Sequence, residues 1–246
     1  MAKKVSNTIA FQGRSGAYSE LASHLAYPKM ETLPTPAFEE TFAAVRDGSA
    51  RYAMIPIENS VAGRVADIHR LMPDSGLSII AEQFLRVNHH LLAPAGATLK
   101  TIRTVHSHVH ALGQCGKLIA KLGLEAIVHA DTAGAAAEIA AADDPTQAAI
   151  ASALAGKVYG LKSLRANVED AEHNTTRFLV MSRRATRPKP GALPPVTTFV
   201  FRVRNVPAAL YKAMGGFATN GVNMTKLESY MLGGEFSATQ FYADIE

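Results

Sequence analysis

The sequence predicts an α/β domain followed by a smaller α+β module. Alanine-rich helical stretches alternate with short β-like runs through residues 9–181, a pattern typical of α/β domains with largely parallel sheets. Residues 186–195 then carry four prolines and a glycine, which predicts an extended linker. After this linker the pattern changes to a strand, a helix and two more strands.

The elements of the first domain are predicted from apolar periodicity and from the residues that interrupt it. Helices are expected at residues 18–27, 38–47, 65–72, 112–122 and 133–142, and in the stretch that ends at Tyr159. Strands or extended segments are expected at residues 9–11, 53–57, 77–93, 126–129, 148–151 and 178–181.

The second module is expected to hold strands at residues 197–203, 223–230 and 236–245 and a helix at residues 208–219. This order is the start of a β-α-β-β-α-β module without its last helix and strand. We therefore expect an exposed sheet edge unless a partner covers it. Whether Glu246 is the natural end of the protein stays open.

Composition narrows the class of protein. The 246 residues are 48% hydrophobic and 19% charged, which is typical of globular proteins. No block of Lys and Arg with interleaved aromatic residues indicates nucleic-acid binding, and the net charge of +4 favours small anions. Cys115 is the single cysteine, so no internal disulfide is expected. No secretory signal or segment of membrane-spanning length is visible, so we expect a cytoplasmic protein without a membrane partner.

Small or hydrogen-bonding residues follow several predicted strands directly. In parallel sheets the carboxyl ends of strands lie beside helix N-termini, whose free N–H groups favour a small anion. The alternative is that these side chains only cap helices. The segments concerned are residues 13–16, 58–60, 131–132 and 152.

The most informative segment is residues 174–178, with the sequence Asn-Thr-Thr-Arg-Phe at the start of a predicted strand. A hydroxyl can donate a proton, and an arginine can bind a carboxylate through two contacts. We expect Thr176 and Arg177 to converge on one ligand, a small acidic substrate with a leaving hydroxyl group.

Over residues 9–246 the chain resembles the prephenate and arogenate dehydratases that carry a C-terminal regulatory ACT domain. Each block that carries the resemblance is short, and their order and spacing make it specific. The blocks are residues 10–13 with 16–19, 56–60, 107–108 with 114–115, 149–152 with 159–161, and 174–178.

The resemblance implies a catalytic domain at residues 1–185 with two α/β lobes, similar to type II periplasmic binding proteins, and a site between the lobes. One lobe would combine about residues 1–84 with 175–185, and the other would hold about residues 85–174. Residues 196–246 would form an incomplete ferredoxin-like ACT domain. We expect a homodimer or a homotetramer, and the sequence does not decide between them.

The implied reaction converts prephenate to phenylpyruvate with loss of water and carbon dioxide, or arogenate to phenylalanine. It needs no cofactor and no metal. The resemblance assigns Thr176 as proton donor to the leaving hydroxyl. Glu58 is the alternative, because a buried carboxyl group would be a better acid than a hydroxyl. The sequence does not decide between prephenate and arogenate.

Arg177 is expected to hold the side-chain carboxylate of the substrate, because a tight ion pair with the departing carboxylate would slow its loss. Phe178 is a candidate to meet the departing group. The resemblance implies a polar pocket around them. The residues expected to bind substrate are Asn59, Ser60, Ser107, Gln114, Ser152, Asn174, Thr175 and Phe178.

The family often shows Ser-His-Pro-Gln where this chain has Ser-His-Val-His at residues 107–110. The change places His106, His108 and His110 at alternate positions, and on a strand they would share one face, as in a zinc site. The simpler interpretation is a polar loop without metal. Cys115 is not expected to act as a nucleophile, since the reaction needs no covalent step. His89 and His90 are interpreted as a pair in a hinge strand.

The implied ACT domain departs from phenylalanine-sensing relatives. Ala208 stands where they have a glycine whose bare backbone admits a ligand, and Tyr230 stands where they have an arginine. Feedback by L-phenylalanine and simple dimerisation therefore both stay open, as does a non-enzymatic phenylalanine or anion sensor on the same fold. The residues expected to bind phenylalanine are Ala208, Ala209, Leu210, Asn223, Glu228 and Ser229.

Overall fold

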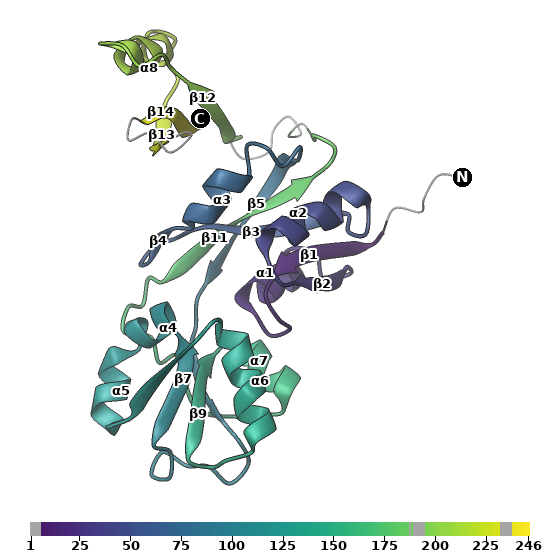
Figure 1. The fold of residues 1–246 in the computed structure, drawn as a ribbon, viewed down its shortest axis with the longest axis vertical. Helices are drawn as coiled ribbons and strands as arrows, with labels where there is room; N and C mark the ends of the chain where they lie inside the picture. The colour runs from purple at the N-terminus through teal and green to yellow at the C-terminus, as the bar shows by residue number, and fades with distance from the viewer. Residues whose placement is uncertain (1–5, 187, 189–194, 232–237) are drawn as a thin grey trace. The chain divides into compact units, whose positions relative to one another are not determined.

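The computed structural model describes residues 6–186, 188, 195–231 and 238–246 (Figure 1). The chain divides into two compact units, residues 1–185 and 186–246, and each is described by itself. Most of the predicted linker, residues 187 and 189–194, lies outside the described part. Among the helices that are described, none combines the length and the apolar character needed to cross a membrane.

The first unit holds a six-stranded sheet with the order β2-β1-β3-β11-β5, and β4 pairs with β3. β1, β2 and β3 are parallel, whereas β11 runs antiparallel to both of its neighbours. The strands are β1 (Thr8–Gln12), β2 (Glu31–Thr35), β3 (Tyr52–Asn59), β4 (Gly63–Arg64), β5 (Ser78–Arg86) and β11 (Thr175–Ser182). The helices beside them are α1 (Tyr18–Ala26), α2 (Phe38–Asp47) and α3 (Ala66–Leu71).

The same unit holds a five-stranded sheet with the order β10-β6-β9-β7-β8. Helices α4 and α5 lie on one side of it and α6 and α7 on the other (Figure 1). The strands are β6 (His90–Ala93), β7 (Thr104–His108), β8 (Glu125–His129), β9 (Gln147–Ala151) and β10 (Lys162–Ala166). The helices are α4 (Val109–Gln114), α5 (Gly116–Leu122), α6 (Thr132–Ala142) and α7 (Ala153–Tyr159).

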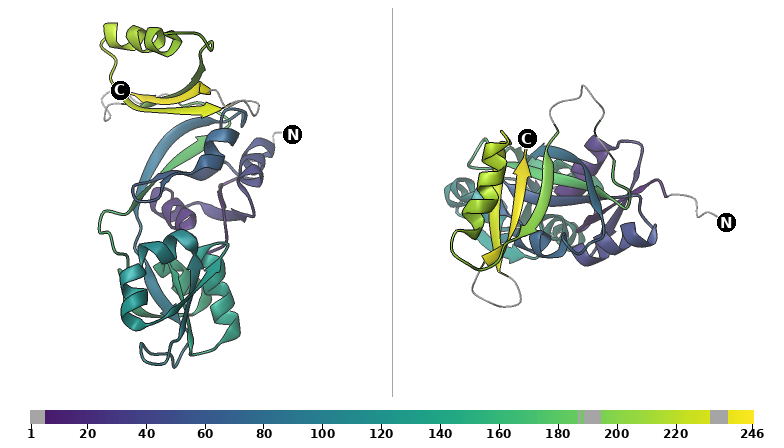
Figure 2. Two further views of the ribbon diagram at one scale, coloured as in Figure 1. Left: turned by 60° about the vertical axis from the view of Figure 1, so that its left-hand side comes forward. Right: turned by 90° about the horizontal axis from the view of Figure 1, so that it is seen from above.

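The α/β class is confirmed, but the prediction of largely parallel sheets is wrong because both sheets are mixed. The chain crosses from the first sheet to the second at residues 87–89 and returns at residues 167–174 (Figure 2). The strands next to these crossings run against their neighbours, which accounts for the antiparallel pairs. The second crossing leads directly into β11, where the Asn-Thr-Thr-Arg-Phe segment lies.

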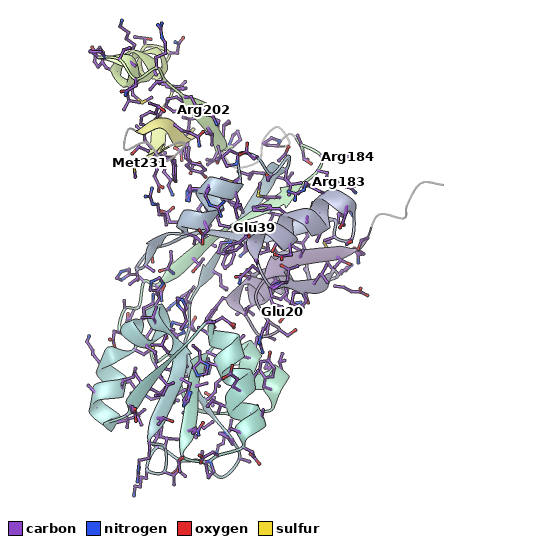
Figure 3. The ribbon with its side chains drawn as sticks, viewed as in Figure 1. Glu20, Glu39, Arg183, Arg184, Arg202 and Met231 are labelled. Carbon is purple, nitrogen blue, oxygen red and sulfur yellow. The ribbon has the colours of Figure 1, made fainter. Side chains whose placement is uncertain are left out.

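The loop after β1 joins the two halves of the first unit. Gly16 has a φ of 92°, and a Cβ atom there would lie 2.7 Å from the Cα atom of Ala155 in α7. The Ser152 hydroxyl donates to the Gly16 carbonyl at 2.6 Å, and Glu20, labelled in Figure 3, accepts from the Gly16 N–H at 2.6 Å. A glycine is therefore required at this position by both conformation and close packing.

Some predicted elements differ from those observed. The single helix expected at residues 112–122 is two helices, α4 and α5, because Cys115 has non-helical angles and the Gln114 carbonyl accepts from the Asp170 N–H at 2.6 Å. The strand β7 replaces the polar loop considered for residues 106–108. It was missed because polar residues occupy both of its faces. β2, with Pro34 in an edge strand, and the exposed β10 were also missed.

The second unit is a β-α-β-β arrangement with the strand order β12-β14-β13, all antiparallel. The central strand carries the buried residues Phe241, Tyr242 and Ala243. Within the described residues β12 pairs only with β14, which leaves the edge that the sequence predicts. The start of the last predicted strand, residues 236–237, lies outside the described part. The elements are β12 (Thr197–Arg202), α8 (Ala209–Thr219), β13 (Met224–Met231) and β14 (Ala238–Ile245).

Candidate functional site

Thr176 and Asn59 lie opposite each other on the neighbouring strands β11 and β3. The side-chain nitrogen of Asn59, Nδ2, donates to Thr176 Oγ1 at 2.9 Å and to Asn174 Oδ1 at 2.7 Å. Both residues are partly buried, and both sit where the chain returns from the second sheet. The antiparallel register of β3 and β11 therefore brings together polar residues that are more than a hundred positions apart.

The polar contacts continue from the first sheet into the second. Asn174 is buried, and its Nδ2 donates to Gln114 Oε1 at 2.9 Å. Gln114 is the last residue of α4, so this bond joins the returning crossing to a helix of the second sheet. The same Gln114 oxygen lies 3.0 Å from His89 Nε2, and His89 Nδ1 lies 2.8 Å from the hydroxyl of Tyr18 in α1. We call these six residues, Thr176, Asn59, Asn174, Gln114, His89 and Tyr18, the polar chain.

Tyr18 and His89 were not predicted as site residues. Tyr18 lies in one of the short blocks that carry the family resemblance, and His89 interrupts an apolar run at the first crossing. Burial is the main cause that lowers the pKa of His89 and raises the pKa of Tyr18 well above its usual value. A buried histidine in a crossing segment was the available signal.

Arg177 and Glu58 lie on the face of the first sheet opposite to Thr176. Thr176 pairs with Leu85, which packs in the core beneath α1, whereas Arg177 pairs with the exposed Phe84. Successive side chains of a strand point to opposite faces. The expectation that Thr176 and Arg177 converge on one ligand from adjacent positions is therefore wrong.

The guanidinium of Arg177 already has an acidic partner. Its Nε donates to Glu82 Oε2 on β5 at 2.8 Å, and Glu58 lies directly across from it on β3. Glu58 in turn faces Arg64 on β4. Charges of alternating sign thus cross the sheet on this face, and such pairs stabilise neighbouring strands.

Three predicted substrate-binding residues are buried and already have partners. Ser107 donates to the Ile150 carbonyl at 2.6 Å, and Ser152 donates to Gly16 and caps α7 through the Ala155 N–H. Phe178 is 1% exposed and packs in the core beneath α1. In this structure these side chains support the sheets and their junction, and their contact with substrate stays a prediction.

Ser60 and Thr175 connect the end of β3 to the returning crossing. The Ser60 hydroxyl donates to the His173 carbonyl at 2.8 Å and accepts from the Thr175 N–H at 2.9 Å. The Ser60 N–H donates to the Thr175 carbonyl at 2.8 Å. These bonds hold the strand ends on which Asn59 and Thr176 lie.

The three histidines do not all lie on one strand face, because β7 contains His106 and His108 but ends there, and His110 belongs to α4. His106 instead contacts His129, with 2.9 Å between Nδ1 and Nε2, and His129 lies 3.2 Å from Glu138. In the described residues no group of three or more His, Cys, Asp or Glu side chains is arranged to hold a metal ion. Burial, followed by the charges of Asp170 and Glu169, raises the pKa of Cys115 to about 12, which disfavours a reactive thiolate.

The residues expected to bind phenylalanine lie at two places in the second unit. Ala208 precedes α8 with a φ of 62°, a conformation that favours glycine. Ala209 and Leu210, which follow it in the sequence, are the first two residues of α8. Asn223 lies before β13, and on that strand Ser229 is exposed while Glu228 accepts from the Tyr230 hydroxyl at 2.8 Å.

An α/β unit with a hydroxyl and several amides gathered near its crossing segments presents the kind of polar groups that bind small polar ligands. A family model described as prephenate dehydratase matches residues 9–186. The chain belongs to the prephenate dehydratase family and is a lyase, which confirms the predicted family and enzyme class.

Relatives and a solved structure agree with this assignment. The chain is 56% identical to a Komagataeibacter europaeus protein named bifunctional N-acyl-homoserine lactone acylase/prephenate dehydratase. The match covers 97% of this chain and 85% of that protein. It is 40% identical over 90% of its length to the chloroplastic arogenate dehydratase/prephenate dehydratase 2 of Arabidopsis thaliana, of which it spans 58%. The structure of an Arthrobacter aurescens prephenate dehydratase in complex with L-Phe matches with a TM-score of 0.84 and 30% identity, over 97% of this chain and 80% of that one.

Proposed function

We propose that this protein converts prephenate to phenylpyruvate, or arogenate to phenylalanine, with Thr176 as the proton donor. The family match supports the reaction class. The observation that carries the role of Thr176 is the 2.9 Å bond from Asn59 Nδ2 to its hydroxyl oxygen. Because this bond fills an acceptor position of the oxygen, the hydroxyl proton stays available for the substrate.

In the proposed reaction, hydroxide leaves one end of a cyclohexadiene ring while the carboxylate at the other end leaves as carbon dioxide. The ring becomes aromatic, which drives the reaction, so a weak acid is sufficient. The donor bond from Asn59 stabilises the negative charge that develops on the Thr176 oxygen as its proton moves. General acid catalysis of this kind contributes about 10²- to 10⁴-fold in rate.

Glu58 is a weaker candidate for the acid. Glu58 does not pair with Thr176 and does not lie on the same face of the sheet. It pairs instead with Arg177 and Arg64, on the opposite face. We assign Glu58 and Arg177 to the face of the sheet opposite to Thr176, where Arg177 forms an ion pair with Glu82.

We also propose an architecture for the two units. The two sheets of the first unit would be the lobes of a periplasmic-binding-protein-like catalytic domain, and the β-α-β-β unit a partial ACT domain. The Arthrobacter relative was solved with L-Phe, which supports L-phenylalanine as a regulatory ligand. A homodimer or homotetramer in the cytoplasm completes the proposal.

The test is turnover of both substrates side by side. Phenylpyruvate is measured by its absorbance in alkali and phenylalanine by chromatography, and the two kcat/KM values identify the preferred substrate. Turnover of at least one substrate supports the proposal. Binding of phenylalanine or a substrate without turnover of either would favour the non-catalytic sensor instead.

Amide hydrolysis of N-acyl-homoserine lactones is a second candidate. It is favoured by the 56% identity to the Komagataeibacter protein, whose name gives both activities. Release of homoserine lactone and fatty acid, followed by mass spectrometry, tests it. A Thr176→Val variant run in parallel shows whether both activities depend on the same hydroxyl.

A further inference from the structure

The direction of hydrogen-bond donation along the polar chain is fixed by two backbone N–H groups that follow β3. The N–H groups of Val61 and Ala62 donate to Asn59 Oδ1 at 3.0 and 2.8 Å. A backbone N–H can only donate, so the amide oxygen of Asn59 must face these groups. Its nitrogen must then face Asn174 Oδ1 and Thr176 Oγ1.

The donor and acceptor atoms of each following amide are then fixed in turn. Because Asn174 Oδ1 accepts from Asn59, Asn174 Nδ2 is the atom that donates to Gln114 Oε1 at 2.9 Å. An amide oxygen only accepts, so the ring nitrogen of His89 that lies 3.0 Å from Gln114 Oε1 must carry a hydrogen. This fixes the proton of a neutral His89 on Nε2 and leaves Nδ1 as the acceptor for the Tyr18 hydroxyl at 2.8 Å.

These bonds leave Gln114 with its oxygen occupied and its amide nitrogen facing away from the polar chain. Its Oε1 accepts from Asn174 on one side and from His89 on the other. Among the residues that the structure describes, no partner is within hydrogen-bonding distance of its Nε2. The side chain is only partly buried, so the two N–H groups of its amide are the part left for a ligand.

We propose that His89 and Tyr18 are positioning residues, which hold the oxygen of Gln114 inward so that its amide N–H groups face the substrate. This inference rests on the proposed function. Tyr18 belongs to α1 beside the first sheet, and Gln114 belongs to α4 beside the second. His89 and Tyr18 therefore hold Gln114 from the other side of the crossing. The N–H groups of Gln114 would then donate to an oxygen of the dianionic substrate.

The arrangement survives protonation of His89. Tyr18 lies near a second acceptor, the Asn88 carbonyl at 3.0 Å. When Nδ1 gains a proton it donates to the Tyr18 oxygen, and Tyr18 turns its hydrogen to Asn88, while Nε2–H stays on Gln114. The other charged or titratable groups near His89 are Glu169, which accepts from its backbone N–H at 2.8 Å, and His90, while Cys115 lies near Tyr18. Burial lowers the pKa of His89, so the neutral form is the working form.

The first experiment compares His89→Gln with His89→Leu. A glutamine can donate from its amide to Gln114 Oε1, whereas a leucine cannot. We expect His89→Leu to lower kcat/KM about tenfold, the effect of one lost hydrogen bond, and His89→Gln to stay within about threefold of wild type. His90→Gln is the matched control, because His90 contacts Ser163 outside the polar chain at 2.9 Å. A His89→Leu enzyme as active as wild type, or a His89→Gln enzyme as impaired as His89→Leu, would overturn the proposal.

The second experiment does not depend on turnover. Nitrogen-15 NMR of labelled histidine distinguishes the two tautomers, and His89→Gln identifies the His89 signals. We expect the Nε2–H tautomer at neutral pH in wild type. The Nδ1–H tautomer would refute the proposed direction of the polar chain. If wild type turns over neither substrate but shows the Nε2–H tautomer, the proposed function fails while the geometry holds.

Discussion

Asn59 lies between the fixed backbone of a turn and the hydroxyl proposed to act as the acid. Its oxygen accepts from two backbone N–H groups, and its nitrogen serves both Asn174 and Thr176. Aspartate has the same size but has no hydrogen to donate. At position 59 it would accept the hydroxyl proton of Thr176 and withdraw it from the substrate.

We therefore predict that Asn59→Asp lowers kcat by about 10²-fold or more, the value of a lost general acid. Steady-state kinetics measures the change, and a thermal melt of the same sample monitors folding. An Asn59→Asp enzyme with wild-type kcat would show that the Thr176 proton does not depend on this bond.

Arg177 makes a second prediction at the same scale. Arg177→Lys keeps the charge but loses the two-pronged geometry that binds a carboxylate. Because Arg177 lies on the face of the sheet opposite to Thr176, we predict that Arg177→Lys leaves kcat and KM within about threefold of wild type and weakens only the ion pair with Glu82. The control is Glu82→Gln, which removes the same ion pair from the other side and should have a similarly small effect on the kinetics. A KM raised about tenfold in Arg177→Lys alone would contradict this placement and would indicate that Arg177 binds the substrate.

His106 gives a pH prediction. Burial, and then the neighbouring His129, lower the pKa of His106, while Glu138 and Glu125 oppose the shift. The unfolded chain therefore binds the proton more readily, so stability falls as pH drops below about 6.5. His106→Gln should reduce the loss of unfolding free energy between neutral and mildly acidic pH, measured by denaturant titration. Equal losses in both proteins would contradict this assignment.

At the scale of elements, the loop after β1 and the start of α7 form a rigid junction between the halves of the first unit. Gly16 combines a positive φ with close packing on Ala155, whereas Gly63 has a φ of 81° and open space where a Cβ atom would lie. A comparison of alanine substitutions at the two glycines therefore separates the free energy of conformational strain from that of overpacking.

We predict that Gly16→Ala destabilises the protein by about 2–4 kcal/mol, since about 1 kcal/mol of conformational strain adds to overpacking of about 1–3 kcal/mol. Gly63→Ala should cost only the conformational part, about 1 kcal/mol. Chemical denaturation measures both. Equal losses of unfolding free energy in the two variants would show that close packing at the junction adds nothing to the effect of Gly16→Ala.

The elements that the sequence predicted well have strong local patterns. Residues 38–47 form α2 with the predicted bounds, and the strand at residues 178–181 is the buried part of β11. The strands that were missed lack such a pattern, because β7 alternates buried Val105 and Ser107 with histidines and β2 contains a proline. Antiparallel pairing also escaped prediction, since it depends on crossings between sheets.

At the scale of the whole molecule, the sequence predicted which polar residues lie close together better than it predicted how they are arranged. Thr176, Asn59, Asn174 and Gln114 were predicted and do lie in one hydrogen-bonded chain. The opposite faces of Thr176 and Arg177 follow from strand alternation once the register is known. The buried roles of Ser107 and Ser152 depend on contacts with distant backbone carbonyls, which no local pattern encodes.

The most direct test of the account is the turnover of Thr176→Val beside Thr176→Ser with the preferred substrate. Valine keeps the shape of threonine without its hydroxyl, and serine keeps the hydroxyl. We expect kcat to fall about 10²-fold or more for valine and about tenfold or less for serine. A Thr176→Val enzyme that turns over at the wild-type rate would contradict the central claim that this hydroxyl gives its proton to the leaving group.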